Sequence, residues 1–70
     1  MKFTVEIASV PDRDDLVAEI WWGEAMVAEL YRGSTGAVEI EIYPAKSHAP
    51  WNFDLASWLG VLAEAKRRLG

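Results

Sequence analysis

The sequence contains no cysteine, and this absence excludes several classes of protein. Without cysteine the chain can form no disulfide framework, no thiolate metal site and no thiol nucleophile. Its apolar runs fall far short of the roughly 18 residues that cross a bilayer. The segment 1–6 alternates in polarity and carries Glu6, which is unlike a secretion signal. We therefore expect a cytoplasmic protein that does not enter a membrane.

The chain is too short for more than one domain. It has 70 residues, of which 51% are hydrophobic, and that share is too high for a disordered chain. A domain of this size buries only about 60% of its unfolded surface, so it builds one thin core. We expect a single domain over residues 1–70.

Basic residues are scarce and unevenly placed. The chain has 7 basic and 11 acidic residues, and three of the basic ones stand in its last five positions. Residues 1–65 therefore hold four basic against eleven acidic side chains. Each contact with a phosphate needs a cation, so the composition disfavours DNA, RNA and anionic membranes as direct partners. It favours a basic protein as partner.

Alternation of apolar and polar residues predicts four strands with short connections. The alternating stretches are 2–8, 16–22, 26–31 and 38–43. Turns are expected at 23–25 and 33–36, and a loop at 10–15, where a proline and three aspartates interrupt the pattern. Consecutive strands joined by short turns form an antiparallel meander.

A helix is predicted after the loop that runs from Pro44 to Pro50. Asp54 is a good N-cap, Phe53 before it can staple onto Trp58, and Gly70 follows the basic last turn. The apolar stripe expected to face the sheet is Leu55, Trp58, Leu59, Leu62 and Leu69, with Ala63 and Ala65 at its edges. Ser57, Gly60, Glu64, Arg67 and Arg68 are expected on the opposite face of the helix. The predicted fold is α+β, a four-stranded antiparallel meander with one C-terminal helix packed on one face.

One helix covers one face of the sheet, so the other face meets water or a partner. We call this the open face. Every strand glutamate falls in its phase, interleaved with aromatic and valine side chains. The expected partner-binding residues are Glu6, Glu19, Trp21, Glu29, Tyr31, Glu39, Glu41 and Tyr43, with Val17 and Val27 between them.

A register can be predicted from the two turns. Trp22 opposite Met26 sets Glu19 opposite Glu29, and Leu30 opposite Val38 sets Glu29 opposite Glu39. Three glutamates would then lie in one row, where like charges repel. Two interpretations stay open: an ordinary polar sheet surface, or a docking surface whose rings supply contact area and whose carboxylates select a basic partner.

Residue patterns for catalysis and metal binding are weak. His48 is the only histidine, and one histidine without cysteine is a poor zinc set. Asp12, Asp14 and Asp15 resemble the start of a calcium loop, but its glycine and distant glutamate are missing. A flat open face offers no enclosed pocket for acid–base chemistry. We expect no cofactor, no metal and no enzymatic activity.

Trp51, Phe53 and Trp58 gather near the predicted helix start. They are interpreted as a hydrophobic staple that closes the core, or as the rim of a binding site. The runs Leu16–Trp22, Ile42–Pro44 and Ala65–Leu69 look like those of small bacterial proteins, a resemblance that implies no function.

The functional prediction is a small non-catalytic inhibitor that docks its open face onto a basic surface of another protein. Two settings fit: an immunity protein that neutralises a toxin, or an anti-CRISPR-type protein that occupies a nucleic-acid-binding groove. The alternative is a homo-oligomer, such as a homodimer, whose sheet faces or edges pack together.

Overall fold

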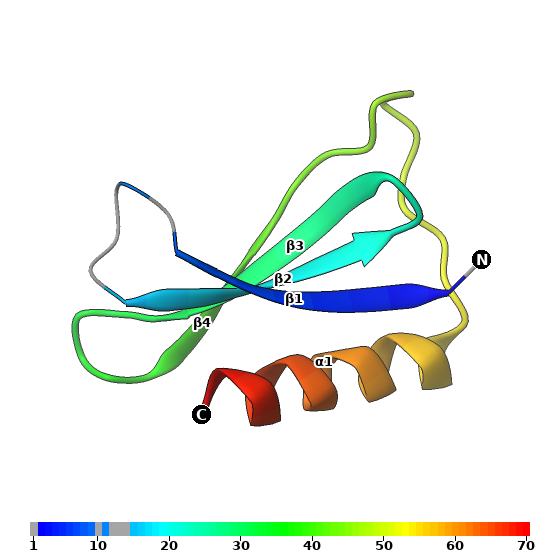
Figure 1. Cartoon of the computed structure of the whole chain (residues 1–70). Helices are drawn as coiled ribbons and strands as arrows, with labels where there is room; N and C mark the ends of the chain where they lie inside the picture. Colours follow the sequence, from blue (N-terminus) through cyan, green and yellow to red (C-terminus); the bar gives the residue numbers. More distant parts are fainter. Residues whose placement is uncertain (1, 10, 12–14) are drawn as a thin grey trace.

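The computed structural model describes residues 2–9, 11 and 15–70 and confirms the α+β fold. The strands are β1 (Phe3–Ser9), β2 (Leu16–Trp22), β3 (Ala25–Arg32) and β4 (Val38–Ile42), followed by α1 (Leu55–Leu69). The strands form one antiparallel sheet in the order β1-β2-β3-β4, with α1 beneath one face (Figure 1). In the predicted loop at 10–15, Val10, Asp12 and Asp14 lie outside the described residues.

The hairpin between β2 and β3 is tighter than predicted. Trp22 pairs with Ala25, which leaves a two-residue loop with Gly23 at φ 61°. Glycine at the first loop position suits the turns that match strand twist in two-residue hairpins. The predicted pairing of Trp22 with Met26 is therefore wrong.

A β-bulge restores the predicted register beyond this hairpin. Trp21 pairs with Met26 and Ile20 with Ala28, so Val27 is an extra residue in β3. The bulge reverses the expected phase at this end of β3. Val27 is buried in the core, whereas Met26 lies opposite Trp21 of the open face. The assignments of Val27 to the open face and of Met26 to the helix side are both wrong.

The hairpin between β3 and β4 is closed by Gly33, whose N–H donates to the Ala37 carbonyl at 2.8 Å. Three residues, 34–36, form the loop, and Gly36 has a φ of 87°. A left-handed glycine after a turn is typical of three-residue hairpin loops. Leu30 consequently pairs with Ile40 rather than with Val38, and Val38 pairs with Arg32.

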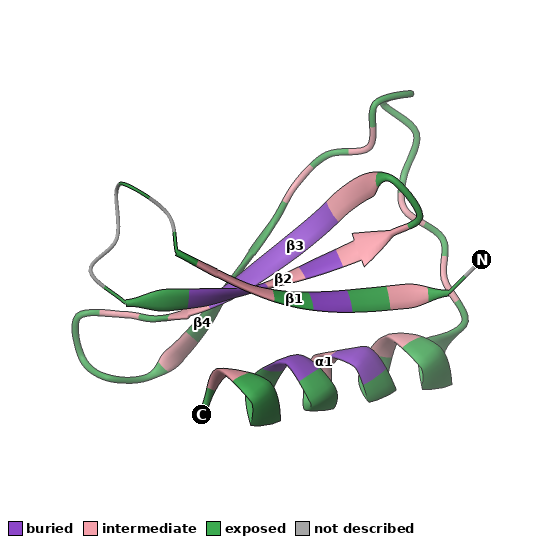
Figure 2. Ribbon diagram, viewed as in Figure 1, coloured by how far each residue is buried: buried purple, intermediate pink, exposed green. Residues whose placement is uncertain are grey.

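The core lies between α1 and the central strands (Figure 2). Its buried members come from three strands and from the middle of the helix: Val5, Ala18, Ile20, Val27, Ala28, Leu30, Val61 and Ala65. Phe3, Trp22, Phe53 and Trp58 close one end through ring contacts, including a stacked Phe53–Trp58 pair with centroids 5.7 Å apart. The predicted staple is present.

The helix caps are as predicted, but the helix is rotated about its axis. Asp54 accepts a hydrogen bond from the Ser57 N–H at 3.0 Å, and the Gly70 N–H returns to the Lys66 carbonyl at 3.3 Å. The buried helical residues are Val61 and Ala65, which the predicted stripe did not centre on, whereas its Leu55 and Leu59 are exposed.

Arg68 is also placed differently from the prediction. Its Nη1 donates to the Val5 carbonyl of β1 at 2.7 Å, so it does not lie on the face of α1 opposite the sheet. The helix therefore buries the smaller Val61 and Ala65, while Trp58, Leu62 and Leu69 of the predicted stripe pack against the core in partly buried positions.

Candidate functional site

The open face carries four of its five strand glutamates in one row across all four strands. Glu6 pairs with Glu19, Glu19 with Glu29, and Glu29 with Glu41. Residues directly opposite one another on a face have Cβ atoms about 4.5–5.5 Å apart. The row is therefore one glutamate longer than the sequence predicts, and it begins and ends on the two edge strands.

Glu39 does not belong to this row. It pairs with Tyr31, so the predicted Glu29–Glu39 pair is wrong. The cause is the hairpin loop at 34–36, whose closing pair moves β4 by two residues relative to the expected register. A shift by two keeps every side chain on its expected face, so Glu41 lies opposite Glu29 and Glu39 lies opposite Tyr31, both still on the open face.

Two further rows flank the glutamates. On one side Ala8 pairs with Val17, and Tyr31 with Glu39; on the other side Thr4 pairs with Trp21, and Trp21 with Met26. Tyr43 follows β4, and its N–H donates to the Val27 carbonyl at 2.8 Å. The pairing and strand phase put the eight residues expected to bind a partner on one side of the sheet.

Burial on the open face rises toward the central strands. Glu6, Glu39 and Glu41 on the edge strands are exposed, Glu19 is half-buried, and only 7% of Glu29 is exposed. Val17 is wholly buried although the helix lies on the other side of the sheet. The face is therefore not flat and open as expected. Its edges are accessible and its centre is closed.

A hydrogen bond orients the central aromatic side chain. The Trp21 indole Nε1 donates to the Glu19 carboxylate at 3.1 Å. Residues two apart in a strand point to the same side, so Glu19 and Trp21 are both on the open face. The hydrogen bond between them holds the indole ring next to the carboxylate. Trp21, Tyr31 and Tyr43 are each half-buried, so part of each ring remains accessible to a partner.

Among the described residues, cationic side chains lie mainly around the face rather than on it. Arg32 pairs with Val38 in the helix-side phase and donates to the Gly36 carbonyl at 3.3 Å. Lys2 is exposed in the open-face phase at the start of β1, and Lys46 lines a hollow with Trp21 and Met26 at the hairpin end. The middle and the β4 side of the face are therefore acidic.

Sequence reasoning missed a second feature, an apolar groove between α1 and β4. The helix packs mainly on β1 and β2 and less on β3. A helix is about 10 Å wide and strands are about 4.8 Å apart, so one helix covers two to three strands and not four. The expectation that one helix covers the whole face was wrong, and this width comparison could have corrected it from the sequence.

The groove is a hollow of about 270 Å³ lined by Val27, Ile42, Trp51, Phe53, Leu55 and Trp58. Trp51 is held there by its indole Nε1, which donates to the Tyr43 carbonyl at 2.7 Å. A second hollow, of about 380 Å³, lies further along β4 beside Val38, Ile40 and Leu62. Trp51, Phe53 and Trp58 thus form both the end of the core and one wall of this groove.

The described residues include neither a cluster of metal-ligating side chains nor a helix that could span a bilayer. Within 2–9, 11 and 15–70, no three His, Asp or Glu side chains are grouped so that they could hold a metal ion. Asp12 and Asp14 of the weak calcium-loop pattern lie outside these residues. His48 is exposed in the loop after β4 at a φ of 62°. In the described chain, no helix has the length and apolar character needed to cross a bilayer.

The chain was compared with protein-family models, curated proteins and solved structures, and none of them matches it. Functional inference therefore rests on the site itself.

Proposed function

We propose that the protein is a small non-catalytic binding protein that docks its open face onto a basic surface of another protein. An inhibitor is the role that such a face serves best, because a row of carboxylates can occupy a surface built for phosphates. An immunity protein acting on a toxin and an anti-CRISPR-type protein acting on a nucleic-acid-binding protein are the two settings proposed.

The observation that carries this proposal is the row Glu6–Glu19–Glu29–Glu41. A row of carboxylates across a sheet attracts a basic partner, because complementary charge steers the encounter and selects the partner. The half-buried rings of Trp21 and Tyr31 on either side of the row add contact area of the kind found at interface centres.

The test is capture of partners by tagged protein in three forms. The first is the wild type, and the second carries Glu6→Lys, Glu39→Lys and Glu41→Lys, three exposed positions of the open face. The third carries Asp15→Lys, Glu24→Lys and Glu64→Lys, which are exposed positions outside the row with the same change in net charge. Each partner identified by mass spectrometry is then purified and titrated against all three proteins.

We expect one basic protein to bind both the wild type and the Asp15/Glu24/Glu64 variant. The same protein should not bind the open-face variant, which carries lysine at positions 6, 39 and 41. Charge pairs at a rim mainly affect association, so the association rate should fall as salt rises. Equal binding by both triple variants would contradict the proposal, because recognition would then lie elsewhere or depend on net charge alone.

A further inference from the structure

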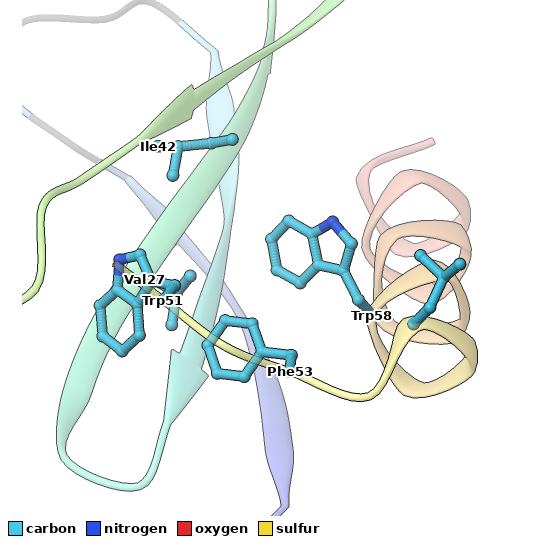
Figure 3. Close-up of a pocket in the computed structure, with 6 residues that line it drawn as sticks. Val27, Ile42, Trp51, Phe53 and Trp58 are labelled. Atoms are coloured by element: carbon cyan, nitrogen blue, oxygen red, sulfur yellow. The ribbon is translucent and has the colours of Figure 1, made fainter. Parts of the chain in front are cut away.

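The outer strand β4 combines an uncovered apolar side with an acidic side. On the helix side, 42% of Ile40 and 57% of Ile42 are exposed, and Leu55 and Leu59 of α1 are also exposed. Figure 3 shows Trp58 reaching from the helix toward Ile42, with Phe53 and Trp51 beside the hollow. On the open face the same strand presents Glu39 and Glu41, both exposed.

The backbone of β4 is oriented to accept another strand. Hydrogen-bonded and non-hydrogen-bonded pairs alternate along an antiparallel ladder. The Tyr43 N–H donates to the Val27 carbonyl of β3. Because hydrogen-bonded pairs recur at every second residue, the N–H and C=O groups of Glu41 and Glu39 also point toward β3. Those of Ile42, Ile40 and Val38 then point outward from the edge. β4 is the last strand in the sheet order and leaves this row open.

At the opposite edge of the sheet, β1 has an outer backbone carbonyl that is already hydrogen-bonded within the protein. At β1 the Arg68 side chain bonds to the Val5 carbonyl at 2.7 Å, and α1 packs against that side of the sheet. A backbone carbonyl of β1 is thereby occupied by a side chain of the protein itself. Of the two edges, β4 is the one better disposed to receive a partner.

A second copy of the chain fits this edge poorly. An antiparallel β4–β4 pair that keeps the isoleucines on the helix side must oppose residues of the same face. Between Val38 and Ile42, the only open-face residues are Glu39 and Glu41. Every such register that pairs at least three residues of β4 with the second copy would therefore place a glutamate opposite a glutamate.

We propose that β4 receives an extended segment of a partner protein in which basic and apolar residues alternate. The segment adds a fifth strand: its Lys or Arg side chains lie beside Glu39 and Glu41, and its apolar side chains cover Ile40, Ile42 and the groove next to Leu55. This proposal rests on the proposed function and names the recognition element of the basic partner. Main-chain bonds supply affinity in such strand addition, and the alternate side chains supply specificity.

The experiment titrates ¹⁵N-labelled protein with a short synthetic peptide that alternates lysine and valine. A second peptide of the same composition has its lysines together and its valines together, so it carries equal charge without the alternation. The protein variants are Ile40→Thr with Ile42→Thr, which keeps every carboxylate, and Leu16→Thr. Leu16 is an exposed apolar residue at the start of β2 and serves as the matched control.

Strand addition predicts that the alternating peptide shifts the amide signals of Val38–Ile42 and slows hydrogen exchange at Ile40 and Ile42. The block peptide should bind at least about tenfold more weakly, and so should the alternating peptide to the Ile40/Ile42 variant. Leu16→Thr should leave binding unchanged. Absence of binding, or dimerisation through β4 instead, would overturn the inference.

Equal binding of both peptides, with shifts spread over the open face, would also overturn it while leaving the proposed function in place. The captured partner separates the two ideas further. If only the open-face lysine variant fails to bind the captured partner, and Ile40→Thr/Ile42→Thr binds it fully, the proposed function is supported. Strand addition at β4 is then rejected. Full binding by every variant rejects both.

Discussion

Glu29 shows at the scale of a single residue how unusual the open face is. Only 7% of Glu29 is exposed, and its cross-strand neighbours are Glu19 and Glu41. Like charges directly opposite cost up to about 1 kcal/mol per pair. Small domains have only about 5–15 kcal/mol of stability in total. The row therefore concentrates carboxylates in the middle of a small sheet, which complements a partner rich in cations.

Replacing Glu6 by lysine should make the protein more stable. Glu6 is exposed on an edge strand opposite Glu19, so Glu6→Lys converts a repulsive cross-strand pair into an attractive one. We expect a gain of up to about 1 kcal/mol in the free energy of unfolding, measured by urea denaturation at low salt. The gain should shrink near 1 M salt, where screening acts within about 3 Å.

Glu24→Lys is the control, because it makes the same charge change in the exposed turn outside the row. If both lysine variants gain equally, then the benefit comes from net charge and the cross-strand repulsion is not the cause.

At the scale of elements, two glycines with open space around them should respond in opposite directions to alanine. Neither Gly60 nor Gly36 has an atom within 4 Å of the position a Cβ would take. Gly60 lies inside α1, so Gly60→Ala should raise the free energy of unfolding by about 1 kcal/mol. Gly36 has a φ of 87°, so Gly36→Ala should lower it by about 1 kcal/mol. Denaturant titration of the two variants measures both; a loss at Gly60 would mean that α1 packs more closely there.

The elements also show where prediction from the sequence succeeds. Strand phase and the caps at Asp54 and Gly70 depend on local spacing, and the fold follows from them. Register depends on loop length, which the letters around Gly23 and Gly33 leave ambiguous by one or two residues. The bulge at Val27 compensates for the shorter first loop, and only tertiary pairing reveals it. The prediction placed the site residues on one face, but it put Glu39 opposite Glu29, where the structure has Glu41.

The helix illustrates a different limit. Leucines dominate its apolar stripe, so hydrophobicity alone selects Leu55 and Leu59 for the core. The sheet instead buries the smaller Val61 and Ala65, whereas Leu55 lines the groove beside β4 and Leu59 is exposed. The sequence contains the groove's residues, but the rotation of α1 that exposes them depends on contacts with β1 and β2.

At the scale of the whole molecule, the two edges of the sheet are protected in different ways. At β1, Arg68 bonds to the outer backbone and the helix packs nearby, whereas β4 presents the carboxylates of Glu39 and Glu41 at its edge. Charged residues on an edge strand are a common defence against pairing between copies. The same charges leave the edge available to a basic strand.

Removing this protection should make the protein self-associate. The variant Glu39→Gln/Glu41→Gln keeps side-chain size and the apolar groove but lets β4 of two copies approach without repulsion. We expect the wild type to sediment as a monomer and the variant to form dimers as concentration rises, with slowed amide exchange at Ile40 and Ile42. Glu6→Gln/Glu24→Gln, with the same change in net charge at sites away from β4, should remain monomeric. A wild type that already dimerises through β4 would contradict this account and favour the homo-oligomer; a variant as monomeric as its control would show that these carboxylates do not prevent edge pairing.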